Sequence, residues 1–378
     1  MSDPERTSLE ECFGDMPDPR VVGRCDHKLL AILLIAICAV LSGAETWDEV
    51  EEFGAVKEDW LKQFLELRNG VPSHDTFRRV FSLLDAQVFQ ERFIAWVEQT
   101  FRVKREQVIA VDGKSVRRSH HRAAGQECLH LVGAWATANG ITLGQRKVEE
   151  GENEIVAIPE LLRHLYLKGC IVTIDAIGCQ KDIAQQIIDQ QADYVLALKA
   201  NQGRLHQDVV EWFEWAQQRD FRQVEHTYHQ TISKGHGRIE VRRCWALSNP
   251  QALEVLGHHE GWPKLTSLVM VQRERRRADL LQTETAYFIS SLPPDAERLL
   301  AAVRSHWHIE NKLHWVLDVI FREDDSRLRV GDGAENFAVL RRLALNLLKL
   351  HPAKMSLKRK RYKAALDDNF LLELLSQV

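Results

Sequence analysis

The stretch from Val108 to Lys199 alternates short apolar runs with helical segments, and this order restricts the possible folds more than any other part of the chain. The run "VIAVDG" predicts a strand, and "HLVGAWATANGITLGQRKV" predicts two more strands joined at Asn139-Gly140, a strong hairpin signal. A helix, a strand, a helix and a strand follow in "NEIVAIPELLRHLYLKG", "CIVTIDA", "QKDIAQQIIDQQ" and "DYVLALK". Antiparallel partners ahead of strand–helix–strand units predict a mixed α/β fold, with a central mixed sheet flanked by helices.

The segments on either side divide the chain further. Residues 1–101 have helical periodicity and include the apolar run from Leu29 to Leu41, which is too short to span a bilayer and predicts a buried helix. Strand-like runs return at about 221–291, where we expect a β-rich insertion, and helical spacing resumes from Asp295. The predicted domains are a helical part at 1–101, the mixed-sheet domain at 102–350 with its insertion, and a basic then acidic tail at 351–378.

Net charge gives a misleading first impression of possible partners. A formal charge of −4 over 378 residues argues against nucleic acid, because nucleic-acid binders are usually basic. However, residues 1–100 hold 10 Lys and Arg against 19 Asp and Glu, whereas residues 298–364 hold 15 against 7. The basic C-terminal part therefore keeps DNA possible, and a hydrophobic content of 45% excludes disordered and collagen-like classes.

The cysteines indicate a reducing compartment. There are seven, an odd number, and no two of them form a C-x-x-C pair. This pattern disfavours both a disulfide framework and a zinc ribbon. The first 20 residues are acidic and polar, unlike a secretory signal. We therefore expect a cytoplasmic protein with free thiols.

Two aspartates are candidates for catalysis because of where they stand. Asp112 and Asp175 each end a predicted buried strand, and in neighbouring strands their carboxylates could converge on one divalent ion. The alternative for each aspartate alone is a simple role as a turn former.

A third carboxylate, Glu310, lies in the helical segment "RSHWHIENKLHWVLD". There four polar residues follow one another at four-residue steps and would share one helix face: His306, Glu310, His314 and Asp318. A solvated face is the alternative, and the H-E-x-x-H spacing of a zinc protease is absent. Two aspartates and one glutamate form an all-oxygen set that suits Mg²⁺ or Mn²⁺, and two such ions suit in-line phosphodiester displacement.

Several long segments resemble one known family in their order along the chain. These are "IAVDGKSVRRS", "TIDAIGCQKDIA", "ALKANQG", "KGHGRIEVRR", "HWHIENKLHWVLDVIFREDDSRLR" and "AENFAVLRRLALNLLK". They are similar to the H-repeat-associated family of insertion-sequence transposases, and residues 1–101 resemble the associated N-terminal domain of that family.

The resemblance implies an RNase H-like catalytic domain whose triad of two Asp and one Glu is Asp112, Asp175 and Glu310. It also implies Mg²⁺ or Mn²⁺, the element's own ends and target DNA as partners, and homo-oligomers on DNA. Related transposases carry a Tyr-x₂-Arg-x₃-Glu-x₆-Lys signature on the glutamate helix. This chain departs from it, with Val303, His306, Glu310 and Leu317 at those positions.

Other polar residues are weaker candidates for phosphate contact, with surface solvation as the alternative. Those near the expected site, on its helix or in the insertion are Lys114, Lys199, Asn201, Arg238, His306 and Lys312. The tail adds a basic run that would bind phosphates without base specificity: Lys358, Arg359, Lys360 and Arg361. Trp307 and Trp315 are more typical of a core than of base stacking.

The function predicted is a DNA transposase of a bacterial cytoplasm, associated with the nucleoid when bound to DNA. It would cleave the ends of its element and join the 3′-hydroxyl to target DNA. A domesticated or inactive DNA-binding relative and an RNase H-like nuclease acting on other DNA are the rival hypotheses.

Overall fold

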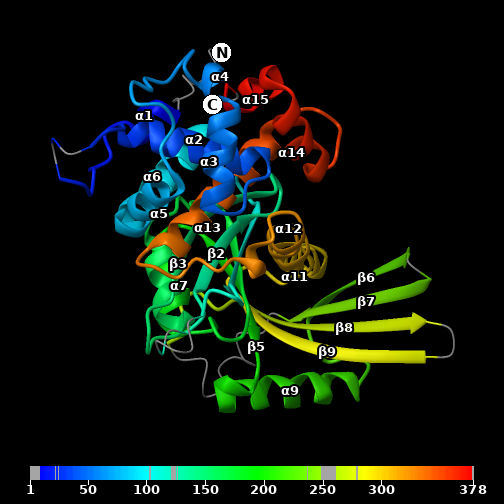
Figure 1. Ribbon diagram of the computed structural model, residues 1–378. Coiled ribbons are helices and arrows are strands. Elements are labelled where there is room, and N and C mark those ends of the chain that lie inside the picture. Colours follow the sequence, from blue (N-terminus) through cyan, green and yellow to red (C-terminus); the bar gives the residue numbers. More distant parts are fainter. Residues whose placement is uncertain are drawn as a thin grey trace, which may run out of the picture.

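One nine-stranded sheet runs through the protein, with helices packed on it and gathered at one end (Figure 1). The computed structural model describes residues 9–21, 23, 25–101, 104–120, 125, 127–235, 237–247, 261–277 and 280–376. The strand order is β3-β2-β1-β4-β5-β9-β8-β7-β6. The strands are β1 (Val108–Ser115), β2 (His130–Ala136), β3 (Ile141–Lys147), β4 (Ile171–Ile174), β5 (Asp193–Leu198), β6 (His226–Gly235), β7 (Arg238–Leu247), β8 (Ser267–Arg277) and β9 (Leu280–Ser290).

The first five strands confirm the predicted mixed sheet. β2 is antiparallel to β1 and to β3, whereas β1, β4 and β5 are parallel. The hairpin at Asn139-Gly140 forms as expected, with Gly140 at φ +69°, a backbone angle that favours glycine. Helices α7 (Glu154–Arg163) and α8 (Lys181–Asp189) make the crossovers that parallel strands require. This arrangement is the RNase H-like core.

The β-rich insertion lengthens that same sheet. Strands β6 to β9 form an antiparallel meander, and β9 pairs with β5 through Leu196 and Ile289. Helix α9 (Gly203–Gln217) precedes the meander and packs against β9. The meander extends sideways from the core, as Figure 1 shows. Within the sheet, β5 therefore separates the insertion from β4, the strand that Asp175 follows.

The N-terminal helices pack with the C-terminal ones. They are α1 (Leu9–Phe13), α2 (Leu29–Ser42), α3 (Trp47–Val56), α4 (Glu58–Leu61), α5 (His74–Leu83) and α6 (Ala86–Thr100). Ser73 and Asp85 cap α5 and α6, since their side chains accept hydrogen bonds from the first turns of these helices. Helix α2 is buried almost throughout, as its uniformly apolar sequence predicts.

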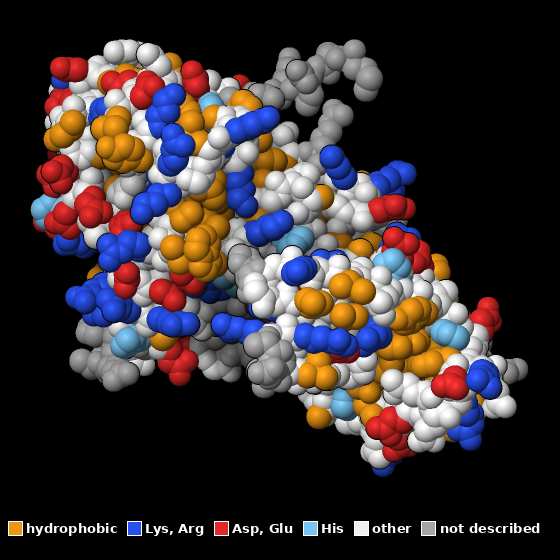
Figure 2. Space-filling view, turned by 90° about the vertical axis from the view of Figure 1, so that its right-hand side faces the viewer, with side chains coloured by type: hydrophobic (Ala, Val, Ile, Leu, Met, Phe, Trp, Pro, Cys, Tyr) orange, Lys and Arg blue, Asp and Glu red, His pale blue; other side chains and the backbone are white. Residues whose placement is uncertain are grey.

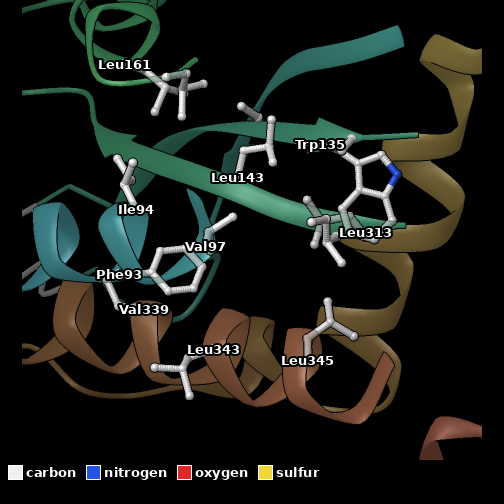
Figure 3. Close-up of a cluster of buried hydrophobic side chains, with 14 of the residues drawn as sticks. Phe93, Ile94, Val97, Trp135, Leu143, Leu161, Leu313, Val339, Leu343 and Leu345 are labelled. Atoms are coloured by element: carbon white, nitrogen blue, oxygen red, sulfur yellow. The ribbon is translucent and has the colours of Figure 1, made fainter. Parts of the chain in front are cut away.

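Helix α13 (Gly333–Leu350) joins the two halves into one core. It packs against α2, α5 and α6 on one side and β3 on the other. Figure 3 shows Val339 of α13 beside Phe93 of α6, and Leu143 of the sheet on the opposite side of α6. The tail continues as α14 (Leu357–Leu366) and α15 (Asp368–Leu375), which also contact α2.

In the described part of the chain, no single helix combines the length and apolar composition needed to cross a membrane. Helices α2 and α3 reach that composition only as a pair bent by 95°. All seven cysteines are free thiols, as predicted.

Candidate active site

Asp112 and Asp175 lie side by side at one edge of the parallel strands. Val111 of β1 pairs in register with Ile174 of β4, and each aspartate is the next residue along its strand. Parallel neighbours end at the same sheet edge, so the two carboxylates come from matching positions. The two aspartates therefore lie on neighbouring strands as predicted, but Asp112 does not end its strand, because β1 continues to Ser115.

Glu310 lies on the helix that crosses this edge, but the helix is not continuous. Helix α11 (Ala296–Ile309) gives way to a π-helical turn, η3 (Glu310–His314), before α12 (Trp315–Val319). Such turns hold one extra residue and often occur at functional sites. The uninterrupted four-residue spacing predicted here was wrong at Glu310 itself, which opens the π-turn and is exposed.

The other three residues of that predicted face contact the strands. His306 Nδ1 lies 3.0 Å from the Thr173 hydroxyl on β4. His314 Nδ1 lies 3.7 Å from an Asp112 oxygen, and burial first, then Lys114, lowers the pKa of His314 to about 3. His314 is therefore neutral beside Asp112, and this part of the helix lies against the strands.

Neighbouring carboxylates are close enough to Asp112 to raise its pKa. Burial, followed by the charge of Asp175, raises the pKa of Asp112 to about 7. Glu310 and Glu154 raise it further, while a hydrogen bond from the Gly113 N–H opposes them. Crowded carboxylates in a partly buried place are the environment that a hard divalent cation relieves.

The candidate ligand atoms suit such a cation, although the side chains that carry them are not gathered around one point. All three candidate ligands offer oxygen atoms, the ligands that Mg²⁺ and Mn²⁺ prefer. Among the described residues, no three His, Cys, Asp or Glu side chains are already gathered closely enough to form a metal centre. Binding of an ion would therefore have to draw the carboxylates together.

Glu154 is a fourth carboxylate that sequence reasoning missed. It opens α7 and lies over Gly113, where an added Cβ would stand 2.1 Å from its Oε1 atom. His130 Nε2 lies 2.7 Å from the same oxygen, and the Ser115 hydroxyl lies 2.8 Å from His130 Nδ1. The signal in the sequence is the glycine directly after Asp112, which leaves space for this carboxylate.

Two hollows differ in charge, and neither is lined by Asp112, Asp175 or Glu310. One of about 280 Å³ lies between α11 and the strands β7 to β9 and includes Arg242, Arg273 and Arg304 in its lining. The other, of about 1020 Å³, is lined on the Glu154 side by several acids, among them Glu149 and Glu335. A polyanion would be attracted to the first side and repelled by the second.

The predicted phosphate-contact residues near the site have different environments. Lys199 and Lys312 are exposed. Asn201 Nδ2 donates to the Ala176 carbonyl, 2.6 Å away, and so ties the end of β5 to the residue after Asp175. Arg238 is half-buried at the start of β7, at the tip of the β6–β7 hairpin.

Three predicted DNA contacts need correction, because their side chains are buried against the protein. Lys114 is 8% exposed and bonded to two carboxylates. The Lys360 ammonium donates to the carbonyls of Leu348 and His351, each 2.7 Å away. Arg361 is buried as well and covers the Phe321 ring.

Lys358 and Arg359 remain exposed on α14. A second correction concerns Trp307 and Trp315, predicted to be core residues, which are 41% and 54% exposed on either side of the π-turn.

Comparison with known proteins agrees with this architecture. Residues 10–97 match the domain described as DDE_Tnp_1-associated, and residues 103–347 match the transposase DDE domain. The chain is 39% identical to the H repeat-associated putative transposase YhhI of Escherichia coli strain K12, over 98% of both chains. It is 40% identical to the putative transposase YncI of Escherichia coli O157:H7, over 98% of this chain and 94% of that one.

A solved structure, a piggyBac transposase synaptic complex with hairpin DNA, is similar at a TM-score of 0.43. The identity is 9%, and the match covers 98% of this chain and 77% of that one.

The sheet order, together with Asp112 and Asp175 on neighbouring strands and a helix across the same edge, defines an RNase H-like protein. The chain belongs to the transposase DDE domain family, and the resemblance to H-repeat-associated transposases is confirmed.

Proposed function

We propose that this chain is a metal-dependent DNA transposase that cleaves the ends of its own element and joins them to target DNA. The observation that supports this most is the raised pKa of Asp112, to which burial and the nearby charges of Asp175 and Glu310 contribute. Burial and the nearby carboxylates make an ionised Asp112 unfavourable unless a cation shares the site.

In this proposal the three carboxylates hold Mg²⁺ or Mn²⁺, with two ions as the expected number. The bound ions would supply charge stabilisation for an in-line displacement at phosphorus. Asp112 and Asp175 hold fixed positions because their strands are hydrogen-bonded to each other. Glu310 comes from the helix and is exposed to the side from which DNA would approach.

DNA is expected on the side of the insertion and α11. Figure 2 shows Lys and Arg side chains spread across this face, with apolar side chains between them in its lower part. Lys199 and Lys312 are exposed there and available for backbone phosphates, and Arg238 extends the possible contact along the insertion. We expect two or more copies to assemble with DNA, since two element ends must be joined in one reaction.

The test is Mg²⁺- or Mn²⁺-supported cleavage of cognate element ends by full-length protein carrying Asp112→Asn, Asp175→Asn or Glu310→Gln. Each change removes one charge with little change in shape. We expect cleavage to fall to the level without protein while DNA affinity stays within about twofold, because ion binding rather than DNA binding is lost.

Asp182→Asn is the matched control, since Asp182 is an exposed acid on α8. It should cleave like the unchanged protein. Retained cleavage in any one active-site variant would remove that residue from the proposed role.

The rival functions predict different outcomes for the unchanged protein. DNA binding without nicking in Mn²⁺ would indicate a domesticated or inactive relative. Preferential cleavage of branched DNA over element ends would indicate a nuclease with another substrate.

A further inference from the structure

Two separate stretches of the chain meet in a seam of opposite charges. Lys114 Nζ lies 2.6 Å from Asp318 Oδ1 and 3.2 Å from Asp324 Oδ1. Arg117 adds a contact of 3.2 Å to Asp324, and the neighbouring Arg118 pairs with Asp325. The seam therefore joins the end of β1 to α12 and to the 3₁₀ turn η4 (Glu323–Asp325).

The seam connects two of the proposed catalytic acids. Lys114 stands two residues after Asp112, so both side chains lie on the same face of β1. Asp318 lies on α12, which directly follows the π-turn opened by Glu310. A rigid link from Lys114 to Asp318 thus limits how far the π-turn can move relative to Asp112.

A second contact holds the other side of the π-turn. Thr173 stands two residues before Asp175 and lies 3.0 Å from His306, one helical turn before Glu310. Each strand that carries a catalytic aspartate therefore also carries, two residues away, a contact to the glutamate helix. Glu310 lies between these two contacts.

The environment of Lys114 argues for a permanent ion pair. Its side chain is 8% exposed, and the side chains of Asp318 and Asp324 are 31% and 21% exposed. Pairs shielded in this way keep more of their attraction than exposed pairs do, and a lysine left without its partners there would be strongly unfavourable. A DNA phosphate would have to displace two carboxylates to reach this ammonium.

We infer that Lys114, through Asp318 and Asp324, is a positioning residue that fixes the π-turn and Glu310 against Asp112, and that it does not contact DNA. This inference rests on the proposed function of the site. It replaces phosphate contact as the role of Lys114, and it gives the acidic run from Glu323 to Asp325 a partner within the chain.

The experiment is a double-mutant cycle in the full-length protein with Lys114→Met, Asp318→Asn and the two changes combined. Rate constants are measured with saturating element-end DNA and Mg²⁺, and DNA affinity is measured separately. We expect each single change to slow cleavage by about tenfold or more, because small misplacements of a catalytic group are costly. Affinity should stay within about twofold, the double variant should be no slower than the slower single one, and Lys114→Arg should recover part of the rate.

The opposite pattern would overturn the inference. If Lys114 held a phosphate, Lys114→Met would weaken DNA binding and lower the salt dependence by about one ion, while Asp318→Asn would free the lysine and leave binding intact or stronger. If the rate reductions of the two single variants multiply in the double variant, the two residues act separately, and this result too would overturn the inference.

A second readout does not depend on catalysis. Hydrogen exchange of the backbone at residues 310–319, in protein without DNA or metal, should speed up in Lys114→Met and in Asp318→Asn. Lys57→Met is the control, because Lys57 forms a similar part-buried pair of 2.5 Å with Asp368 far from the site. Unchanged exchange at 310–319 would refute the positioning role, whereas absence of cleavage in the unchanged protein would refute only the proposed function.

Discussion

At the scale of single residues, the candidate site contains a carboxylate that lowers the stability of the folded chain. Asp112 is partly buried and surrounded by the charges of Asp175, Glu310 and Glu154. An ionised carboxylate in that place raises the energy of the metal-free folded chain. Proteins commonly hold such unfavourable groups where a ligand will later compensate for them.

Because ionised Asp112 is unfavourable in the folded chain, the stability of the metal-free protein should depend on pH. Below about pH 4 the Asp112 carboxyl is protonated in both folded and unfolded chains. As the pH rises toward 7, the folded chain keeps the proton more tightly because the folded-state pKa is raised to about 7, so the free energy of unfolding falls. The Asp112→Asn variant has no carboxyl to ionise at this position, so its free energy of unfolding does not fall in this way. At pH 8 it should be more stable than the unchanged protein by roughly 2–4 kcal/mol.

Denaturant unfolding in chelator from pH 4 to 8 measures the difference. The difference in stability between the variant and the unchanged protein should disappear toward pH 4 and become smaller when Mg²⁺ is added. A difference that stays constant across this range would show that Asp112 is not perturbed.

Residue-scale sequence reasoning has a clear physical limit. It finds Asp112 and Asp175 because a polar residue at the end of a buried strand is a local pattern. It misplaces Lys114, because a lone lysine in a sequence is expected in solvent and its two partners lie 204 and 210 residues away. Sequence reasoning misses Glu154 for the same reason, since only the fold brings this residue over Gly113.

At the scale of elements, sequence periodicity predicts which helices and strands form and in what order. It predicts irregular turns inside a helix less well. The strands and helices from β1 to β5 follow in the predicted order, because alternating runs report directly which faces are buried. The π-turn η3 is not predicted, since the buried apolar residues Ile309, Leu313 and Val316 keep an ordinary helical spacing through it. Yet that turn is what carries Glu310.

Helix α14 offers a prediction at this scale, because its basic run has two faces. Lys358 and Arg359 are exposed, whereas Lys360 and Arg361 are buried and bonded to backbone carbonyls. Lys358→Ala with Arg359→Ala should weaken DNA binding and flatten its salt dependence without lowering the melting temperature.

Lys360→Ala with Arg361→Ala should instead destabilise the fold by about 2–4 kcal/mol, because buried carbonyls lose their donors. Salt-dependent binding and thermal melts of both variants separate the two faces. Equal effects of the two variants on melting would contradict the division.

At the scale of the whole molecule, α13 holds the N-terminal helices and the sheet together. The Asn336 side chain on α13 is fully buried and donates to the carbonyls of Phe81 and Leu84, each 2.8 Å away. Asn346, on the same helix, accepts from the Thr142 N–H and donates to the Thr142 carbonyl on β3. Paired contacts on both sides of one helix predict that the two halves unfold together.

Asn336→Ala tests this coupling. It should lower the free energy of unfolding by about 2–4 kcal/mol, since two buried carbonyls lose their donor. Unfolding followed by circular dichroism and by tryptophan fluorescence should remain one transition with a lower midpoint. Asn369→Ala, at an exposed position, is the control. Two separate transitions in the variant would show that the halves are independent.

The contacts between the two ends of the chain also dictate when it can fold. The Arg361 guanidinium reaches the Val40 carbonyl on α2, 321 residues earlier, and Lys57 pairs with Asp368, 311 residues later. A ribosome must therefore release nearly all of these residues before the first helices are covered. Domains usually fold in order of synthesis. In this protein, helix α2 emerges early but meets its partners on α14 and α15 only after nearly all of these residues have been made.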